Sequence, residues 1–263
     1  MKRTHKTVAG YGLIAALASA ALAGPSAGQP PKSDQPAPAP LFTGSGTELF
    51  RGLFDYYGLA PLRTPILAIP GNHDAREAMR EALAAEGYLP AHGFLHYAVE
   101  QGPLRFVGLD TLVPGQGGGE LGAERLAWLD ATLSLRPDVP TLVLMHHPPF
   151  LTGIAHMDRI GLQGREGFAA VMRRHDQVEA ILCGHVHRPM HARVGGRPAM
   201  ISPSPAHQVA LDLRPEGPSA FRLEPPGYML HRWQNRQLVS HTAVLGDWPG
   251  PFPFFDASGK LID

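Results

Sequence analysis

At 263 residues, 44% of them apolar, the chain is long enough for one large domain or two small ones with a sizeable core. Lys+Arg and Asp+Glu balance at 23 each, which argues against a general nucleic-acid binder. Histidine is abundant at 14 residues and favours a metal or acid–base site, while the single cysteine, Cys183, excludes an internal disulfide.

The amino-terminal segment differs from the rest of the chain. Lys2 and Arg3 precede an apolar run, residues 8–23, that ends in Ala21-Leu22-Ala23. This order predicts a secretory signal peptide over 1–23, and the run is too short for a transmembrane helix. The alternative is an alanine-rich segment without a targeting role. Residues 24–40 are rich in Pro, Ser and Gln, which predicts a linker. A true signal would export the protein to the periplasm or medium; otherwise the cytoplasm is expected.

From residue 41 to 263 the sequence predicts one domain in which strands and helices alternate, so an α/β fold is expected. We find no internal repeat. The predicted helices are 48–59, 76–85, 123–133 and 166–175, and the predicted strands are 65–70, 95–99, 104–110, 141–145, 178–183, 199–201, 208–213, 228–233 and 238–242.

Polar, histidine-containing loops follow three of these apolar strands. They are Gly71-Asn72-His73-Asp74, His146-His147-Pro148-Pro149 and Gly184-His185-Val186-His187. In layered α/β folds, functional groups gather on loops beyond the carboxyl ends of the strands. The three loops are therefore predicted to converge on one site.

Each loop alone has a functional and a structural interpretation. Neutral imidazoles of His185 and His187 suit Zn, Fe, Cu or Ni, but two exposed loop histidines would look the same. Asn72 offers an oxygen ligand beside a possible proton donor, His73, although Gly-Asn is also common in tight turns. Prolines after His146 would hold its imidazole in place, or simply stiffen the loop. The order of the three loops and their shared position at the ends of strands favour the functional interpretation.

Taken together, the three blocks resemble those of the calcineurin-like metallophosphoesterases. The closing strands around His231 and His241 are similar to those of the class III cyclic-nucleotide and glycerophosphodiester phosphodiesterases within that superfamily. The resemblance extends over about residues 44–256. It implies a sandwich of two mixed β-sheets flanked by helices.

The resemblance also implies roles for individual residues. Asn72, His146 and His185 match ligands of the family's second metal, and His187 matches a ligand of its first. His73 matches the histidine that contacts the scissile phosphate and assists departure of the leaving group. Asp74 matches the acidic residue that orients that histidine.

The sequence departs from the family's pattern before Gly71. The family opens with an Asp-x-His block and a Gly-Asp block, which supply an Asp and a His to the first metal and the Asp that bridges both. Neither block occurs here. Thr43-Gly44 is similar to the lead-in to the second, but Ser45 follows where Asp is expected, and Asp34 and Asp55 lack the required neighbours. We therefore expect the N-terminal strands to be missing or replaced.

The resemblance implies metal-dependent hydrolysis of a phosphodiester, either a cyclic nucleotide of the 3',5'-cAMP type or a small glycerophosphodiester, through a metal-bridging hydroxide. The expected cofactors are divalent Mn, Fe, Zn or Co ions. The family binds two such ions, and the donors recognised in this sequence would hold one. Two alternatives stay open: a catalytically impaired or inactive remnant, truncated or frameshifted, and a phosphomonoesterase of the same superfamily. A small-molecule substrate is expected, without a nucleic-acid polymer or a membrane span, and a homo-oligomer is compatible with the sequence.

Overall fold

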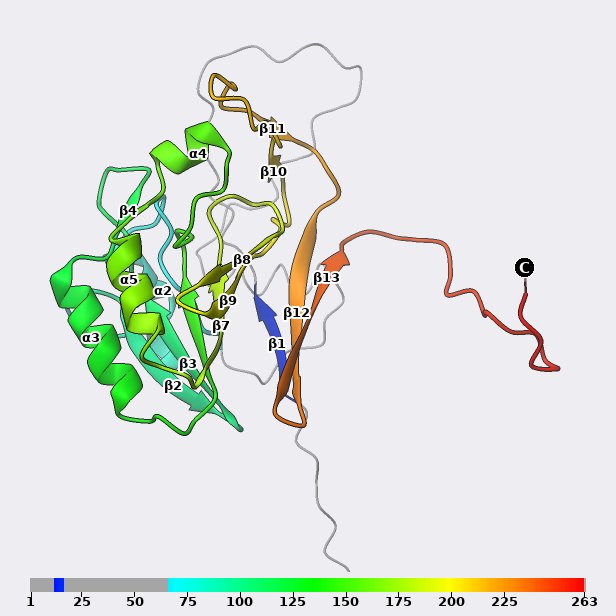
Figure 1. Ribbon diagram of the computed structural model, residues 1–263, viewed down its shortest axis with the longest axis horizontal. Coiled ribbons are helices and arrows are strands. Elements are labelled where there is room, and N and C mark those ends of the chain that lie inside the picture. Colours follow the sequence, from blue (N-terminus) through cyan, green and yellow to red (C-terminus); the bar gives the residue numbers. More distant parts are fainter. Residues whose placement is uncertain (1–11, 17–65, 263) are drawn as a thin grey trace, which may run out of the picture.

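The computed structural model describes residues 12–16 and 66–262, with side chains from residue 66 onward. Its centre is a six-stranded mixed sheet in the order β2-β3-β5-β7-β9-β8 (Figure 1). The four inner strands run parallel, and the two edge strands pair antiparallel to their neighbours. The strands are β2 (Tyr97–Gln101), β3 (Leu104–Leu109), β5 (Thr141–Met145), β7 (Val178–Cys183), β8 (Met190–Val194) and β9 (Arg197–Ile201).

The central strands β3, β5 and β7 are mainly apolar, as expected where both faces of a sheet are covered. Every residue of β3 is buried, and β7 is buried at all but one position. The carboxyl ends are in register, since Leu109 pairs with Met145 and Met145 with Cys183. The loops that follow β5 and β7 therefore leave the sheet at the same edge.

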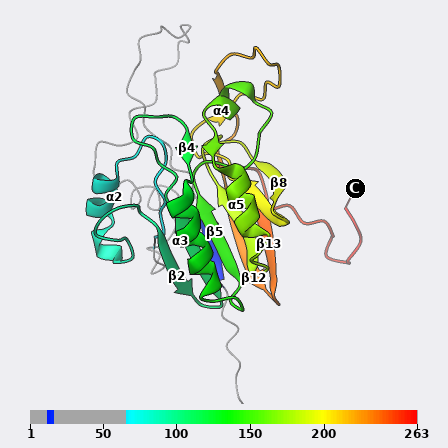
Figure 2. The ribbon, with the colours of Figure 1, turned by 60° about the vertical axis from the view of Figure 1, so that its left-hand side comes forward.

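Helices cover one face of this sheet. Helices α3 (Ala123–Ser134) and α5 (Arg165–Met172) lie side by side across β5 (Figure 2), and Leu129 and Phe168 bury their side chains completely in this layer. Short α4 (Ala155–Arg159) lies beyond α5, near the edge where the loops emerge. Helix α2 (Arg76–Ala82), followed by the 3-10 turn η1 (Ala84–Glu86), lies beside β2 and buries none of its residues.

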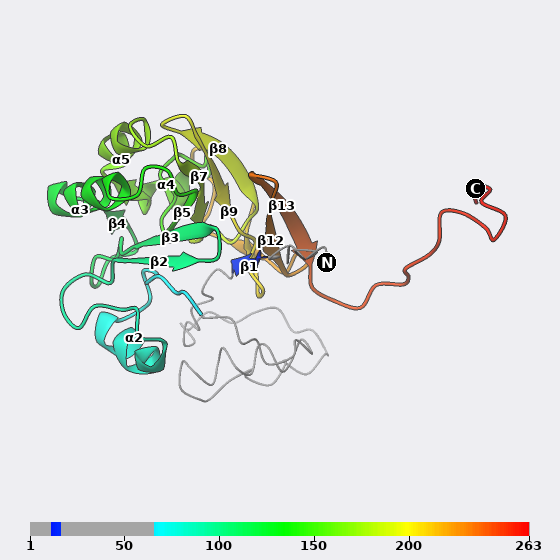
Figure 3. The same ribbon diagram turned by 90° about the horizontal axis from the view of Figure 1, so that it is seen from below.

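A second sheet covers the opposite face (Figure 3). It has the order β1-β12-β13, with β1 (Gly12–Ala16), β12 (Gly227–Gln234) and β13 (Gln237–Val244) all antiparallel. Alternate residues of β12 are buried, and Met229 and Trp233 pack against residues of the large sheet. Two small pairs complete the topology: β4 (Gly119–Glu120) with β6 (Leu162–Gln163), and β10 (Gln208–Val209) with β11 (Phe221–Arg222).

The predicted sandwich of two sheets flanked by helices is confirmed, with one correction. The larger sheet is mixed, but the described strands of the second sheet are purely antiparallel. Strand β1 falls inside the stretch predicted to be a signal peptide and pairs with β12. The linker 24–40, the helix 48–59 and Thr43 to Ser45 lie outside the described residues.

The strand predicted over 65–70 was wrong for the residues that the structure describes. Residues 66–70 are irregular. The Ala68 N–H donates to the hydroxyl of Tyr88 at 2.7 Å, and the Ile66 N–H donates to the Glu86 carboxylate at 3.3 Å. Side chains satisfy these two backbone donors, and residues 66–70 do not pair as a strand with the sheet.

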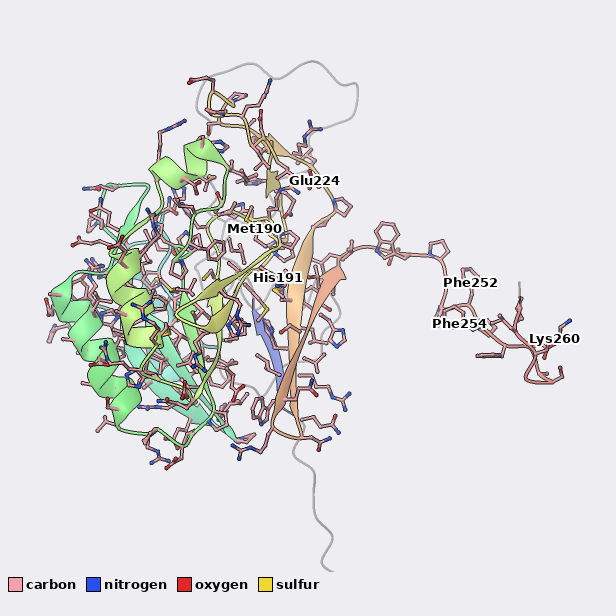
Figure 4. All side chains as sticks on the ribbon, viewed as in Figure 1. Met190, His191, Glu224, Phe252, Phe254 and Lys260 are labelled. Carbon is pink, nitrogen blue, oxygen red and sulfur yellow. The ribbon has the colours of Figure 1, made fainter. Side chains whose placement is uncertain are left out.

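After β13 the chain leaves the body of the molecule as an extended tail with an aromatic character (Figure 4). Phe252 and Phe254 are 75% and 78% exposed. None of the helices in the described part of the chain has the length and apolar character that crossing a bilayer requires.

Candidate metal centre

The three histidine-containing loops meet at one cavity of about 160 Å³. Loop 71–74 lies beside the loops that follow β5 and β7, and the β10 region closes the remaining side. The cavity is lined by Gly71, Asn72, His73, Asp74, His146, Met157, His185, His187, His207 and Val209. All six residues proposed from the sequence thus lie around one space.

His146 lies at the centre of the closest contacts. Its Nε2 atom is 2.8 Å from Asn72 Oδ1 and 3.2 Å from His185 Nδ1. A tetrahedral ion with bonds of about 2.1 Å would hold its ligand atoms roughly 3.4 Å apart. Asn72, His146 and His185 therefore need only small movements to share one ion.

The other nitrogens of the cluster are turned to the protein. His185 Nε2 donates to the carbonyl of Ile160 at 3.1 Å, which leaves Nδ1 directed at His146. His147 contributes a third ring to the group, and one nitrogen from each of His146, His147 and His185 lies within 4.8 Å of the other two. Both of its nitrogens are engaged, with Thr111 Oγ1 at 2.8 Å and the Gly117 carbonyl at 3.2 Å. His147 therefore supports the ligand loops, and an ion would have to compete with those two bonds for it.

Burial keeps these imidazoles neutral. Desolvation, reinforced by the neighbouring His185 and His147, holds the pKa of His146 well below its usual range. Burial first and His147 second lower the pKa of His185 to about 3. The pKa of His187 falls to about 4, mainly through burial and then through His207. A neutral imidazole is the protonation state that binds a metal.

The loop after β7 has an unusual backbone. His185 and His187 have φ angles of 69° and 58°, in the left-handed region that favours glycine. Each such residue costs about 1–3 kcal/mol and persists only where its surroundings fix it. Here Val186 is fully buried between them, and the Ser204 N–H donates to the His187 carbonyl at 3.0 Å. The strained turn brings both imidazoles toward the cavity.

Glycine at position 71 is required by a close approach. A Cβ atom there would lie 2.9 Å from Cε1 of His146. The Gly71 N–H also donates to the Asp74 carboxylate at 2.8 Å, and the Asp74 N–H returns a bond to the Gly71 carbonyl. This small turn places Asn72 toward His146 and leaves His73 exposed at the rim. The Asp74 carboxylate thus closes the turn, and its predicted role in orienting the His73 ring stays a prediction.

The described donors around the cavity are mainly neutral nitrogens and one amide oxygen. His187 Nδ1 is buried without a hydrogen-bond partner among the described residues, as expected of an atom meant for a ligand. Asp74 is the one carboxylate among the residues that line the cavity, and it is occupied by Gly71. Two divalent ions about 4 Å apart repel strongly unless a carboxylate bridges them. Asp34 and Asp55, the aspartates that precede Gly71 in the sequence, lie outside the described residues.

Sequence reasoning overlooked His207. Its ring centroid is 4.7 Å from that of His187 and 4.8 Å from that of Phe221, so it joins the cavity to the β10–β11 pair. A lone histidine between Ala206 and Gln208, without a second polar residue at a regular spacing, carries no recognisable signal. His147 was visible beside His146, but its role as a support depends on Thr111, which is distant in sequence.

A mixed α/β sheet with neutral ligands converging beyond its strand ends is the layout of a metal-dependent α/β enzyme. The sequence model described as calcineurin-like phosphoesterase matches residues 43–189. The chain belongs to this family, and its class is that of the metallophosphoesterase hydrolases.

Two relatives found by sequence agree with this assignment. A protein of Arcobacter nitrofigilis named probable glycerophosphodiester phosphodiesterase GpdQ is 39% identical over 230 residues, which are 85% of this chain and 84% of that protein. The 3',5'-cyclic adenosine monophosphate phosphodiesterase CpdA of Escherichia coli (strain K12) is 34% identical over 147 residues, which are 56% of this chain and 52% of that protein. Among solved structures, a dimetal phosphatase from Danio rerio superposes with a TM-score of 0.46 at 17% identity, over 76% of this chain and 77% of that one.

Proposed function

We propose that the cavity hydrolyses phosphodiester bonds in small molecules, either 3',5'-cyclic nucleotides or glycerophosphodiesters. The observation that carries this proposal is the close grouping of Asn72 Oδ1, His146 Nε2 and His185 Nδ1 beside an exposed His73. The names of the relatives, a glycerophosphodiester phosphodiesterase and a cyclic AMP phosphodiesterase, support the substrate class.

The residues present divide the chemistry between them. Asn72, His146 and His185 would hold a divalent ion, which when bound draws charge from the phosphate and makes water more acidic. Hydrolysis forms one P–O bond to a water oxygen and breaks the ester P–O bond. The departing alkoxide needs a proton, and His73 at the rim would supply it. Asp74 holds the turn that carries both Asn72 and His73.

The donor set favours a second candidate, in which the chain binds one ion per molecule and turns over slowly. The matched ligands are an amide and imidazoles, all neutral, and the lining carboxylate of Asp74 is already engaged. A nitrogen-rich neutral site favours later first-row ions such as Zn²⁺. A single ion held by Asn72, His146 and His185 would supply less positive charge to the phosphate than two ions would.

One experiment separates the candidates. Metal content is measured by elemental analysis, and turnover is measured with Mn²⁺ on 3',5'-cAMP, a glycerophosphodiester, bis-p-nitrophenyl phosphate and the monoester p-nitrophenyl phosphate. Turnover of diesters supports the first proposal, and preference for the monoester overturns it. One ion with negligible turnover supports the second candidate. Two ions with rapid turnover would mean that ligands outside the described residues, or from a second subunit, complete the site.

A further inference from the structure

The turn that carries Asn72 and His73 continues into a helix whose first turn has no buried apolar residue. Helix α2 begins at Arg76, two residues after Asp74, and none of its residues is buried. Figure 3 shows it beside β2, set apart from α3 and α5. Most helices in proteins are fixed by packing an apolar face. At the far end of α2, Leu83 is buried and Arg80 Nε donates to the Pro90 carbonyl at 2.9 Å, so the end next to the turn needs a contact of its own.

That contact is a buried ion pair. Asp110, immediately after β3, is fully buried, and the Arg76 side chain is 15% exposed. Arg76 Nε donates to Asp110 Oδ2 at 2.5 Å, Nη2 donates to Oδ1 at 2.9 Å, and Nη2 also donates to the Leu112 carbonyl at 2.8 Å. A two-pronged pair of this kind fixes both distance and orientation.

Asp110 is itself held from several sides. Its carboxylate accepts the N–H groups of Leu95 at 2.9 Å and Leu112 at 3.0 Å. Its own N–H donates to His96 Nδ1 at 3.0 Å, and the His96 ring stacks on Trp128 with centroids 4.7 Å apart. The carboxylate is thus part of the rigid sheet end, and Arg76 is the group it orients.

The ring of Phe94 covers the pair from outside. The Arg76 guanidinium lies 5.2 Å from its centroid, and the Arg125 guanidinium lies 4.2 Å from it. Arg125 donates in turn to the carbonyls of Asp110 at 3.2 Å and Glu120 at 2.7 Å. An aromatic cover limits the access of water, which strengthens the ion pair.

We propose that Arg76 and Asp110 are positioning residues that set His73 and Asn72 against the histidine cluster. The Asp74–Gly71 bonds make residues 71–74 a closed turn, and Ala75 alone separates that turn from Arg76. A shift of Arg76 is therefore passed directly to His73. The effect of this ion pair on catalysis rests on the proposed function. The coupling of Arg76 to the turn is independent of that function.

The test uses a charge-neutral pair of substitutions. Removing one partner alone would leave a buried charge and could unfold the protein, so Arg76→Met is combined with Asp110→Asn. Arg76→Lys, which keeps the charge and loses the fork, provides a milder variant. The matched control is Glu77→Gln on the same helix, which breaks an exposed 2.8 Å pair with Arg80.

The first measurement is amide exchange and needs no activity. We expect exchange in residues 71–76 to accelerate roughly tenfold or more in the double variant, as the loss of charge-assisted bonds implies, while residues 141–145 stay unchanged. Arg76→Lys should show a smaller change and Glu77→Gln none. Unchanged exchange in 71–76, or equal acceleration throughout the protein, overturns the proposal, whether or not the wild type hydrolyses phosphodiesters.

The second measurement separates positioning from mere stability. Bis-p-nitrophenyl phosphate releases an anion that needs no proton, whereas 3',5'-cAMP releases an alkoxide that does. We expect the double variant to lose turnover of 3',5'-cAMP by a factor about ten times larger than its loss on the nitrophenyl ester. Equal losses on both substrates overturn the positioning role. A wild type inactive on every substrate refutes the proposed function, and the exchange result then decides the coupling alone.

Discussion

Position 71 accepts only glycine without rearrangement, because the imidazole of His146 lies too close for a side chain. The Gly71→Ala substitution places a methyl group 2.9 Å from His146 Cε1, so His146 or the turn must move. We expect Zn²⁺ affinity, measured by calorimetric titration of chelator-treated protein, to fall by about 10–100-fold, as for other changes that disturb ligand orientation. Gly117→Ala is the control, because a Cβ there meets nothing nearer than 3.5 Å. Equal affinities in both variants would show that the turn does not hold a ligand.

His73 differs from the other histidines of the cavity because it is exposed at the rim and is not among the closest contacts. We expect His73→Ala to keep its metal content and to lose turnover of alkoxide-releasing diesters by about 10²–10⁴-fold, the usual contribution of a positioned acid. His92→Ala removes another exposed histidine, away from the cavity, and should change neither property. A parallel loss of metal in His73→Ala would make His73 a ligand.

At the scale of elements, the pairing of β1 with β12 conflicts with the predicted removal of a signal peptide. The residues of β1 pair along β12 from Gly12↔Trp233 to Ala16↔Met229, yet the sequence predicts removal of 1–23 on export. We expect exported protein to begin near Gly24, as determined by amino-terminal sequencing. Loss of β1 leaves one side of β12 without that strand, so the processed form should melt several degrees below the full chain. An intact Met1 on exported protein would argue against a cleaved signal.

Elements with a strong local signal were predictable, and those decided by distant partners were not. Strands β5 and β7 have the bounds that the sequence predicts, because short apolar runs buried on both faces leave few alternatives. The apolar run 66–70 has the same appearance, but the side chains of Tyr88 and Glu86 take two of its backbone donors. The prediction failed there because those contacts lie 20 residues away.

The candidate site shows the same division. Asn72, His146, His185 and His187 were found from motifs at strand ends, and they line one cavity. The contact between Arg76, next to the turn that carries Asn72, and Asp110 was not predictable, since the two residues are 34 positions apart in the sequence. Sequence motifs indicate the polar groups that gather at the cavity, whereas the contacts that support them depend on tertiary geometry.

For the molecule as a whole, buried histidines outside the cavity predict sensitivity to acid. Burial lowers the pKa of His231 to about 4, and His231 is fully buried with Nδ1 on Ser240 Oγ at 2.8 Å. The unfolded chain has a higher pKa, near 6.5, and so binds more protons below it. Stability is therefore fully present above about pH 6.5 and falls as the pH drops toward 4, by on the order of 3 kcal/mol for this residue.

This prediction is checked by urea unfolding between pH 7.5 and 4.5. The His231→Leu variant should show a shallower loss of unfolding free energy over that window than the wild type does. Burial also lowers the pKa of His96 to about 4. His96 should therefore still contribute to the pH dependence of the unfolding free energy in that variant. Identical slopes in the wild type and His231→Leu would contradict the assignment of the effect to His231.

The left-handed backbone at His185 and His187 has a consequence for protein engineering. Selection for heat resistance alone would favour glycine at both positions, because glycine relieves the unfavourable φ angles. Such a variant would gain robustness and lose the two imidazoles at once. Thermostability and ligand binding are thus opposing selection pressures in this turn, and a library screened for one should be counter-screened for the other.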